Sequence, residues 1–260
     1  MADRPAQDRN IAATFAKGMA VLEAFATEAE TGLSLAEIAR RTGQDRAAAR
    51  RGALTLVNLG YLRRDGRHYR LSPRVLRLAG AFLQANRFGR LVQPVLNHHA
   101  AALGAEITLA CRDGDGALLL AQSNAHSGPV TQGFTLGSRL PLWHTALGRM
   151  LLALEPPETM RALLQAARLP RPTPQALTDP AAIAAAIDTA RAAGHALSDG
   201  EFEPGIVGLA VPVGPPGVQP VVAGSSTPRG TGDALHVEAL LRGLQHCAAE
   251  LRQAGGLSGF

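Results

Sequence analysis

The sequence predicts an α+β fold, with a small helical unit that ends in a hairpin and a larger part built on a mainly antiparallel sheet. Three observations support this fold class. Apolar residues recur at helical spacing before residue 60, an Asp-Gly pair separates two short strand-like runs at 61–71, and strand-like and helix-like segments alternate after residue 104. The 260 residues, 46% of them hydrophobic, suffice for one large domain or two small ones.

A first helix is expected within residues 11–26, and a second begins at a capping box. The apolar stripe of the first consists of Phe15, Met19, Leu22 and Phe25. In the second, the Ser34 hydroxyl can accept the N–H of residue 37, and the Glu37 carboxylate can reach back to the helix start. This short helix is expected to end at Gly43.

A longer basic helix is expected from about Arg46 to Leu59. Asp45 can cap its first turn, where a carboxylate also suits the positive end of the helix dipole. Its expected apolar face contains Ala49, Ala53, Leu56 and Leu59, with Arg46, Arg50 and Arg51 on the other side. Gly52 lies in the middle and costs about 1 kcal/mol relative to alanine.

A hairpin is expected at Asp65-Gly66, because this pair between two strand-like runs is the strongest local hairpin signal. The order of helix, short helix, tight turn, basic helix and basic hairpin is that of a winged helix-turn-helix. We assign residues 11–72 to this domain. Ser72-Pro73 then begins a linker helix, with serine as the cap and proline in the first position, and we assign residues 73–87 to it.

Residues 88–255 are expected to form the second domain. A helix around 88–103, restarted at Pro94, precedes a hairpin with strands at 107–112 and 117–122. Further strands are expected at 130–136, 206–213 and 219–225, and helices at 145–154, 157–167, 180–194 and 233–253. This order predicts a mainly antiparallel sheet.

Composition argues against several classes of protein. No apolar run approaches the ~20 residues that span a membrane, and residues 1–5 lack the apolar stretch of a secretory signal. Cys111 and Cys247 are far apart, which excludes a disulfide framework and a cysteine-rich zinc site. No dinucleotide-binding glycine motif or P-loop is present. We therefore expect a cytoplasmic protein with no metal and no cofactor.

The positive charge is concentrated near the N-terminus. Residues 1–85 hold fourteen Arg or Lys against eight Asp or Glu, a net charge of +6, whereas residues 86–260 have a net charge of −1. Residues 40–70 contain nine arginines and only two aspartates. A basic block at one end of a neutral chain is an electrostatic footprint for a polyanion.

We interpret this basic block as a surface for double-stranded DNA. A recognition helix enters the major groove, where arginine forks fit guanine edges or phosphates. The residues expected there are Arg46, Ala47, Arg50 and Arg51. The residues expected to grip the phosphate backbone from the hairpin are Arg63, Arg64 and Arg67. The alternative is a solvated basic face.

A helix start in the second domain is a candidate anion site. Leu140-Pro141 leads into a helix that begins near Thr145, and backbone N–H groups at a helix start suit a carboxylate. Small side chains there allow a close approach. The alternative is an ordinary capped helix.

An acidic run is a second candidate site. Asp199, Glu201 and Glu203 alternate, so in an extended chain they would share one face. With His195 nearby, an enzyme could use them for acid/base chemistry or for a metal ion. The alternatives are a solvated loop or carboxylates that bond backbone amides.

Several segments, taken in order, resemble the IclR family of bacterial transcription regulators over nearly the whole chain. They are residues 15–25, 35–43, 59–62, 139–141 with 148–149, and 203–205 with 210–213. The resemblance implies operator binding, a GAF-like α/β effector-binding domain, a homodimer or homotetramer, a small organic acid as effector and no enzymatic activity. It also suggests RNA polymerase as a partner.

Residues 46–51, Arg-Ala-Ala-Ala-Arg-Arg, look like those of the Pca/Pob-type regulators of aromatic acid breakdown. This resemblance implies an aromatic acid as effector. It places ligand contacts at Trp143, His144, Thr145, Ala146, Leu147, Asp199, Gly208, Gly224 and Ser226.

The chain departs from this subgroup at three places: Gly52, where a large apolar residue is usual, Trp143-His144, and residues 199–203. We expect Trp143 to form a flat wall for a ring and Asp199 to bind a ligand hydroxyl. We expect Thr145 and Ser226 to offer hydroxyl groups. The glycines at 208 and 224 are expected to open space in the pocket.

The sequence thus predicts a ligand-responsive, DNA-binding transcription regulator of a catabolic operon. One rival is an enzyme with an accessory helix-turn-helix and an acid/base or metal site around Asp199 and Glu201. The other rival is a purely DNA-binding protein whose second domain dimerises and contains no cavity.

Overall fold

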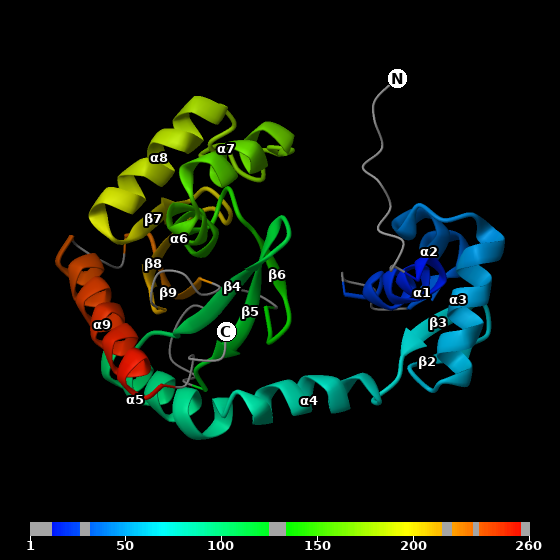
Figure 1. Cartoon of the computed structure of the whole chain (residues 1–260). Helices are drawn as coiled ribbons and strands as arrows, with labels where there is room; N and C mark the ends of the chain where they lie inside the picture. Colours follow the sequence, from blue (N-terminus) through cyan, green and yellow to red (C-terminus); the bar gives the residue numbers. More distant parts are fainter. Residues whose placement is uncertain (1–11, 27–31, 125–133, 215–219, 231–233, 256–260) are drawn as a thin grey trace. The chain divides into compact units, whose positions relative to one another are not determined.

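The computed structural model describes residues 12–26, 32–124, 134–214, 220–230 and 234–255 (Figure 1). The chain divides into two compact units, residues 1–82 and 83–260. Within the described part of the chain, no helix combines the length and the apolar character that a membrane crossing requires.

In its described residues, the N-terminal unit contains the three predicted helices, most of the following linker helix and a small antiparallel sheet, of which the sequence predicted the hairpin alone. The helices are α1 (Ala13–Glu23), α2 (Leu35–Thr42) and α3 (Arg46–Asn58). The strands are β1 (Leu33–Ser34), β2 (Leu62–Asp65) and β3 (His68–Leu71), in the spatial order β1-β3-β2. The β2–β3 hairpin therefore forms the expected wing.

The predicted caps of α2 and α3 are confirmed, whereas the linker helix begins at Val75, after a turn at Pro73, and not at Pro73 as predicted. The Ser34 N–H donates to the Glu37 carboxylate at 2.8 Å, and the Glu37 N–H donates to Ser34 Oγ at 3.3 Å. Asp45 accepts the N–H of Ala48 at 2.8 Å. Gly43 ends α2 in the left-handed conformation, with φ of +64°.

Helices α1 and α3 pack closely through small residues. A Cβ added at Gly52 would lie 3.0 Å from Cγ2 of the buried Val21, so the glycine permits this approach. Leu59 was expected in the apolar face of α3, but it follows the last helical residue and is half exposed. The helix buries Ala48, Ala49, Ala53 and Leu56 instead.

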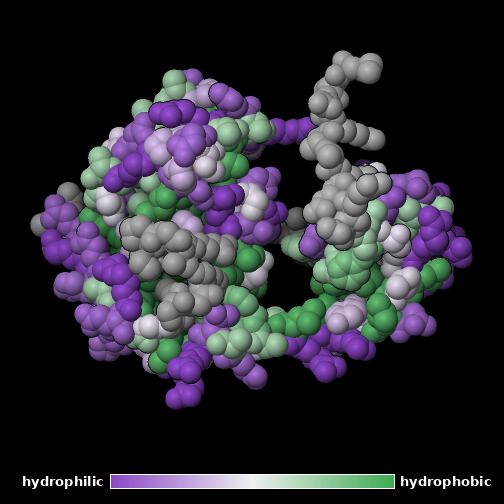
Figure 2. All heavy atoms as spheres, viewed as in Figure 1, coloured by the Kyte–Doolittle hydropathy of each residue, from purple (hydrophilic) through white to green (hydrophobic). Residues whose placement is uncertain are grey.

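Helix α4 (Val75–Ala85) carries large apolar side chains on its surface. None of its residues is fully buried, and the exposed fractions of Leu76 and Leu78 are 67% and 56%. Figure 2 shows hydrophobic residues along the visible face of this helix. Leu83, in the last turn, packs against the core of the C-terminal unit.

The C-terminal unit is built on one six-stranded sheet. Its strands are β4 (Thr108–Asp113), β5 (Gly116–Gln122), β6 (Arg139–Pro141), β7 (Ala196–Asp199), β8 (Ile206–Pro212) and β9 (Val221–Pro228). Their order is β6-β5-β4-β9-β8-β7, and all neighbouring pairs are antiparallel. Its helices are α5 (Gln93–Leu103), preceded by a π-helical turn over Phe88–Val92, α6 (Ala146–Leu154), α7 (Pro157–Ala166), α8 (Pro180–Ala193) and α9 (Ala234–Gln253).

The strand expected at 130–136 is placed differently. Residues 130–133 lie outside the described residues, and residues 134–136 are not in a strand. The chain turns at Gly137, whose φ is +86°, and among the described residues pairing with β5 begins there and continues into β6.

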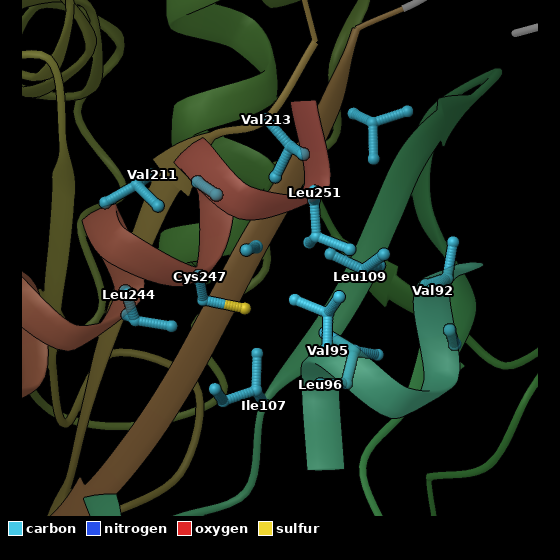
Figure 3. Close-up of a cluster of buried hydrophobic side chains, with 14 of the residues drawn as sticks. Val92, Val95, Leu96, Ile107, Leu109, Val211, Val213, Leu244, Cys247 and Leu251 are labelled. Atoms are coloured by element: carbon cyan, nitrogen blue, oxygen red, sulfur yellow. The ribbon is translucent and has the colours of Figure 1, made fainter. Parts of the chain in front are cut away.

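Helices cover both faces of the sheet, so that alternate strand residues enter two cores. On one face, α5 and α9 pack against Leu109 and Cys111 of β4 and against Val211 of β8. Figure 3 shows Leu244, Cys247 and Leu251 of α9 directed toward this face. On the other face, Ala110 of β4 belongs to the core that includes residues of α6, α7 and α8 (Figure 1).

The first turn of α6 packs against the rest of the unit at three glycines. A Cβ added at Gly148 would lie 2.3–2.6 Å from the backbone of Leu142. A Cβ at Gly208 of β8 would lie 3.4 Å from Cβ of Ala146, and one at Gly224 of β9 would lie 2.6 Å from Cδ2 of Leu147. The absence of side chains at these positions therefore fixes how closely α6 approaches the sheet.

We predict that Gly148→Ala destabilises the C-terminal unit by about 2 kcal/mol or more, because backbone atoms of Leu142 block the added methyl group. The matched control is Gly80→Ala in α4, where no atom lies within 4 Å of the added Cβ. There alanine should be neutral or stabilise by roughly 0.5–1 kcal/mol, since it favours a helix. Thermal unfolding followed by calorimetry distinguishes the two. An equal effect of both variants would contradict this packing.

Candidate functional site

The basic face of the N-terminal unit is formed by α3 and the β2–β3 hairpin. All seven residues predicted to contact DNA are exposed, namely Arg46, Ala47, Arg50, Arg51, Arg63, Arg64 and Arg67. The opposite side of α3 is buried in the core of the unit, which holds the exposed side outward. The structure thus presents a basic helix next to a basic hairpin, as a winged helix-turn-helix requires.

The hairpin carries its arginines at a tight turn. Gly66 adopts a φ of +59°, and Arg64 Nε donates to the Gly66 carbonyl at 3.0 Å. Arg70 Nε lies 3.7 Å from the carboxylate of Asp65 on the neighbouring strand β2. Arg63 and Arg67 are exposed on the hairpin.

The C-terminal unit contains a cavity of about 710 Å³, its open mouth included. It lies on the α6 face of the sheet, where the first turn of α6 meets β4, β8 and β9. Its lining consists of Glu106, Thr108, Leu119, Gln122, Phe134, Leu140, Thr145, Ala146, Leu147, Ser198, Phe202, Glu203, Ile206, Gly208, Leu209, Gly224, Ser225 and Ser226. Its lining combines apolar side chains with a few polar groups, which is typical of a site for a small organic ligand.

The start of α6 offers backbone donors to this cavity. The first N–H groups of a helix have no acceptor within it. Thr145 caps one of them, since its Oγ1 accepts the Gly148 N–H at 3.1 Å, and its carbonyl accepts the Arg149 N–H in the first regular hydrogen bond of the helix. The N–H groups of Ala146 and Leu147 remain at the helix start, and both residues line the cavity. This arrangement suits an anion.

Six of the nine predicted ligand contacts line the cavity: Thr145, Ala146, Leu147, Gly208, Gly224 and Ser226. Two details differ from expectation. The Thr145 hydroxyl already donates to the Pro141 carbonyl at 2.7 Å, so it does not offer a hydrogen to a ligand. Gly208 and Gly224 do not open space, because Ser198 Oγ lies 2.9 Å from a Cβ added at Gly208 and Leu147 Cδ2 lies 2.6 Å from one added at Gly224.

Trp143 and His144 do not line the cavity, which corrects the prediction for both. Trp143 is 7% exposed and packs within the core on the α6 side of the sheet. His144 is 1% exposed, and its Nε2 lies 3.1 Å from the carbonyl of Leu177. The tight turn before α6 directs both side chains into the core. Phe134 and Phe202 supply the aromatic wall instead, with ring centroids 5.9 Å apart.

The three carboxylates of the acidic run go to three different places. The exposed Asp199 pairs with Arg229 at 2.7 Å and does not line the cavity, which corrects its predicted role. Glu201 pairs with Arg149 of α6 at 2.7 Å, with both side chains buried. Glu203 lines the cavity, and burial raises the pKa of its carboxyl group. The residues do not share a face because the chain turns at Gly200, whose φ is +67°.

Several cavity residues were missed in the sequence. Glu106 lies two residues before the first residue of β4, and Thr108 and Gln122 are directly opposed on β4 and β5. The alternation of Glu106, Thr108 and Ala110 along β4 was a usable signal, because alternate residues face the same side of a sheet. Phe134, Ser198 and Ile206 join the cavity only through the pairing of distant segments.

The features required by the enzyme rival are not assembled in the described residues. His144 bonds Leu177 and His195 lies 3.2 Å from the Ala193 carbonyl, so neither was found to bond Asp199 or Ser226. Among the described residues, no group of three or more His, Cys, Asp or Glu side chains could hold a metal ion. The cavity itself argues against the second rival, which predicts a closed domain.

Comparison with known proteins gives consistent matches over both units. A family model described as the IclR helix-turn-helix domain matches residues 14–66, and one described as the bacterial transcriptional regulator IclR C-terminal domain matches residues 81–252. The chain is 36% identical over 206 residues to a Pca regulon regulatory protein of Pseudomonas putida, and the matched region covers 79% of this chain and 70% of that protein. It is 33% identical to a Pca operon regulatory protein of Acinetobacter baylyi, over 92% of this chain and 88% of that one.

A solved structure is similar throughout. It is an IclR homolog from Microbacterium hydrocarbonoxydans in complex with 4-hydroxybenzoate, with a TM-score of 0.73 and 26% identity, and it covers 92% of this chain and 99% of that one. The family models and these relatives describe transcriptional regulators rather than enzymes.

We predict that the C-terminal unit loses stability as the pH falls through about 6.5. Burial lowers the pKa of His144 below its ordinary value, so the unfolded chain binds a proton more readily than the folded one. Stability should therefore be highest above this range and decrease on acidification. The variant His144→Gln keeps a donor for the Leu177 carbonyl but cannot take up a proton. Its stability should therefore decrease less than that of the wild type as the pH falls from 8. Thermal unfolding between pH 5.5 and 8 measures it, and an unchanged slope would refute the assignment.

Proposed function

Because the chain belongs to the IclR family of bacterial transcriptional regulators, we propose that a small aromatic carboxylate binds in the cavity at the start of α6 and controls operator binding by α3 and the hairpin. The observation that carries this proposal is the cavity, which joins backbone donors of α6 to a pair of aromatic rings. One end of such a site suits an anion and its wall suits a ring.

The relatives support the choice of an aromatic acid. The similar Microbacterium structure holds 4-hydroxybenzoate, and the curated relatives are regulators of pca genes. We propose the same class of effector for this chain. The effector contacts are then Thr145, Ala146, Leu147, Gly208, Gly224 and Ser226, together with Phe134 and Phe202.

For DNA binding, we propose that Arg46, Ala47, Arg50 and Arg51 face the major groove. Phosphates of the DNA backbone beside that groove would be contacted by Arg63, Arg64 and Arg67 of the hairpin. All of these residues are exposed on one helix and its adjoining hairpin. The protein would act on operator DNA in the cytoplasm.

We also propose a homo-oligomer, a dimer or a tetramer, in which ligand binding changes the placement of two DNA-binding units. The apolar side chains on the surface of α4 support an association through this helix. We assign residues 11–72 to the DNA-binding domain, 73–87 to the linker and 88–255 to the effector domain. The coupling between ligand and DNA amounts to about 1–3 kcal/mol in typical allosteric proteins. Contact with RNA polymerase remains a prediction.

We predict that Arg50→Ala and Arg51→Ala each weaken operator binding by about 1–3 kcal/mol, because a base-reading arginine is lost. Arg63→Ala on the hairpin should weaken binding to all sequences equally and lower the salt slope by about 1. Fluorescence anisotropy with duplexes selected from a random pool, at several salt concentrations, measures both effects. If both α3 variants bound the operator as tightly as the wild type, the proposal that α3 lies in the major groove would be wrong.

We predict that 4-hydroxybenzoate binds more tightly than its methyl ester, because only the acid is an anion at the helix start. The gain at a helix N-terminus is about 0.3–2 kcal/mol. Ala146→Pro is a matched backbone variant, since proline fits the first helical position but removes the N–H donor. Thr145 before it has an extended backbone that accommodates proline.

In Ala146→Pro, the affinity of the acid should approach that of the ester, with unchanged secondary structure by circular dichroism. Calorimetry measures all four affinities. Equal binding of acid and ester to the wild type would show that the carboxylate does not lie at α6.

A further inference from the structure

The cavity carries two carboxylates and no cationic side chain among its described lining residues. The acids are Glu106 and Glu203, and the lining contains no Arg, Lys or His. A ligand carboxylate beside either of them would be repelled, because like charges in a partly buried site are unfavourable. An acidic ligand therefore has to place its carboxylate away from at least one of these groups and to meet that group with a hydrogen-bond donor.

Glu106 lies at the side of the cavity opposite to the start of α6. In the sheet, Gly208 of β8 pairs with Ser226 of β9, and Ala146 packs over Gly208. Continuing the β4–β9 register past the Thr108–Gly224 pair places Glu106 level with Ser226. Glu106 is thus two strands away from the residue beneath Ala146, a distance of about 10 Å at the usual strand spacing. A substituted aromatic acid is long enough to reach from one side to the other.

The Glu106 carboxylate is held in place and keeps one oxygen for a ligand. The backbone carbonyl of Glu106 accepts a hydrogen bond from the Ser225 hydroxyl at 2.6 Å. Its Oε1 accepts the Gln122 amide at 2.5 Å and lies 3.5 Å from Thr108 Oγ1. Among the described residues, none was found to donate to Oε2. Glu203 has no comparable support, since no described side chain orients its carboxylate.

We propose that Glu106 determines ligand specificity, with its Oε2 accepting a hydrogen bond from a ring hydroxyl or another O–H or N–H donor of the bound acid. This inference rests on the proposed function and adds a residue that selects among acids. A carboxylate accepts hydrogen bonds but donates none. A ligand without a ring donor offers no hydrogen bond to Oε2 of this partly buried carboxylate. A methoxy group in the same place would put its acceptor oxygen beside the acceptor Oε2.

The loss of such a charged hydrogen bond corresponds to roughly a tenfold to hundredfold difference in affinity. We therefore expect the wild type to bind the better of 3- and 4-hydroxybenzoate at least tenfold more tightly than benzoate. It should also prefer that acid to the corresponding methoxybenzoate. Each of these probes has the same carboxylate, so the comparison isolates the ring substituent.

The experiment is calorimetry with the full-length protein and three variants. In Glu106→Met the preference for hydroxybenzoate over benzoate should fall to about twofold or less, mainly through weaker binding of the hydroxy acid. In Glu106→Gln, which keeps a neutral acceptor, the preference should be intermediate, and this variant decides the matter if the first does not fold. Glu203→Gln is the matched control and should keep the wild-type preference.

Three outcomes overturn the proposal. They are a wild type without a hydroxyl preference, a preference that survives in both Glu106 variants, and a preference that is lost in Glu203→Gln alone. In each of these three outcomes the protein still binds the acids, so the proposed function stands while the role of Glu106 does not. If the wild type binds none of the acids, the proposed function fails and the role of Glu106 fails with it.

Discussion

The close packing of the first turn of α6 against the sheet is the constraint on which the C-terminal unit depends. Side chains at Gly148 and Gly224 would collide with Leu142 and Leu147, and a Cβ at Gly208 would reach ordinary contact with Ala146 and lie 2.9 Å from Ser198 Oγ. This packing brings the helix start down to the level of the strands. The cavity then occupies the part of the sheet face that α6 leaves uncovered, and its lining includes both the first residues of α6 and Glu106.

The buried Arg149–Glu201 pair connects this helix to the loop that completes the cavity. Arg149 of α6 contacts both carboxylate oxygens of Glu201 and also donates to the carbonyl of Leu197 in β7. The next residues after Glu201, Phe202 and Glu203, line the cavity. Removing one partner would leave an uncompensated buried charge, which is strongly unfavourable. The ion pair therefore fixes the loop relative to α6, and a ligand at the helix start contacts both parts at once.

Features determined by neighbouring residues could be predicted from the sequence, and features determined by distant ones could not. The Ser34–Glu37 capping box and the Asp65-Gly66 hairpin depend on residues a few positions apart. The fate of Asp199 depends on Arg229, and that of His144 on Leu177. The acidic run looked like one face only because the left-handed turn at Gly200 is not visible in its alternation. Glu106 enters the site through the pairing of β4 with β9, which are more than a hundred residues apart.

Helix α4 has a mechanical consequence for the connection between the two units. It has eleven residues and none of them is fully buried. Isolated helices shorter than about 12–15 residues are marginal in water, so packing contributed by other surfaces sets its helix–coil balance. A residue advances the chain by about 1.5 Å in a helix and by about 3.3 Å when extended. Each residue that left the helix would thus lengthen the connection by roughly 2 Å, so the helical content of α4 would set the length of the connection.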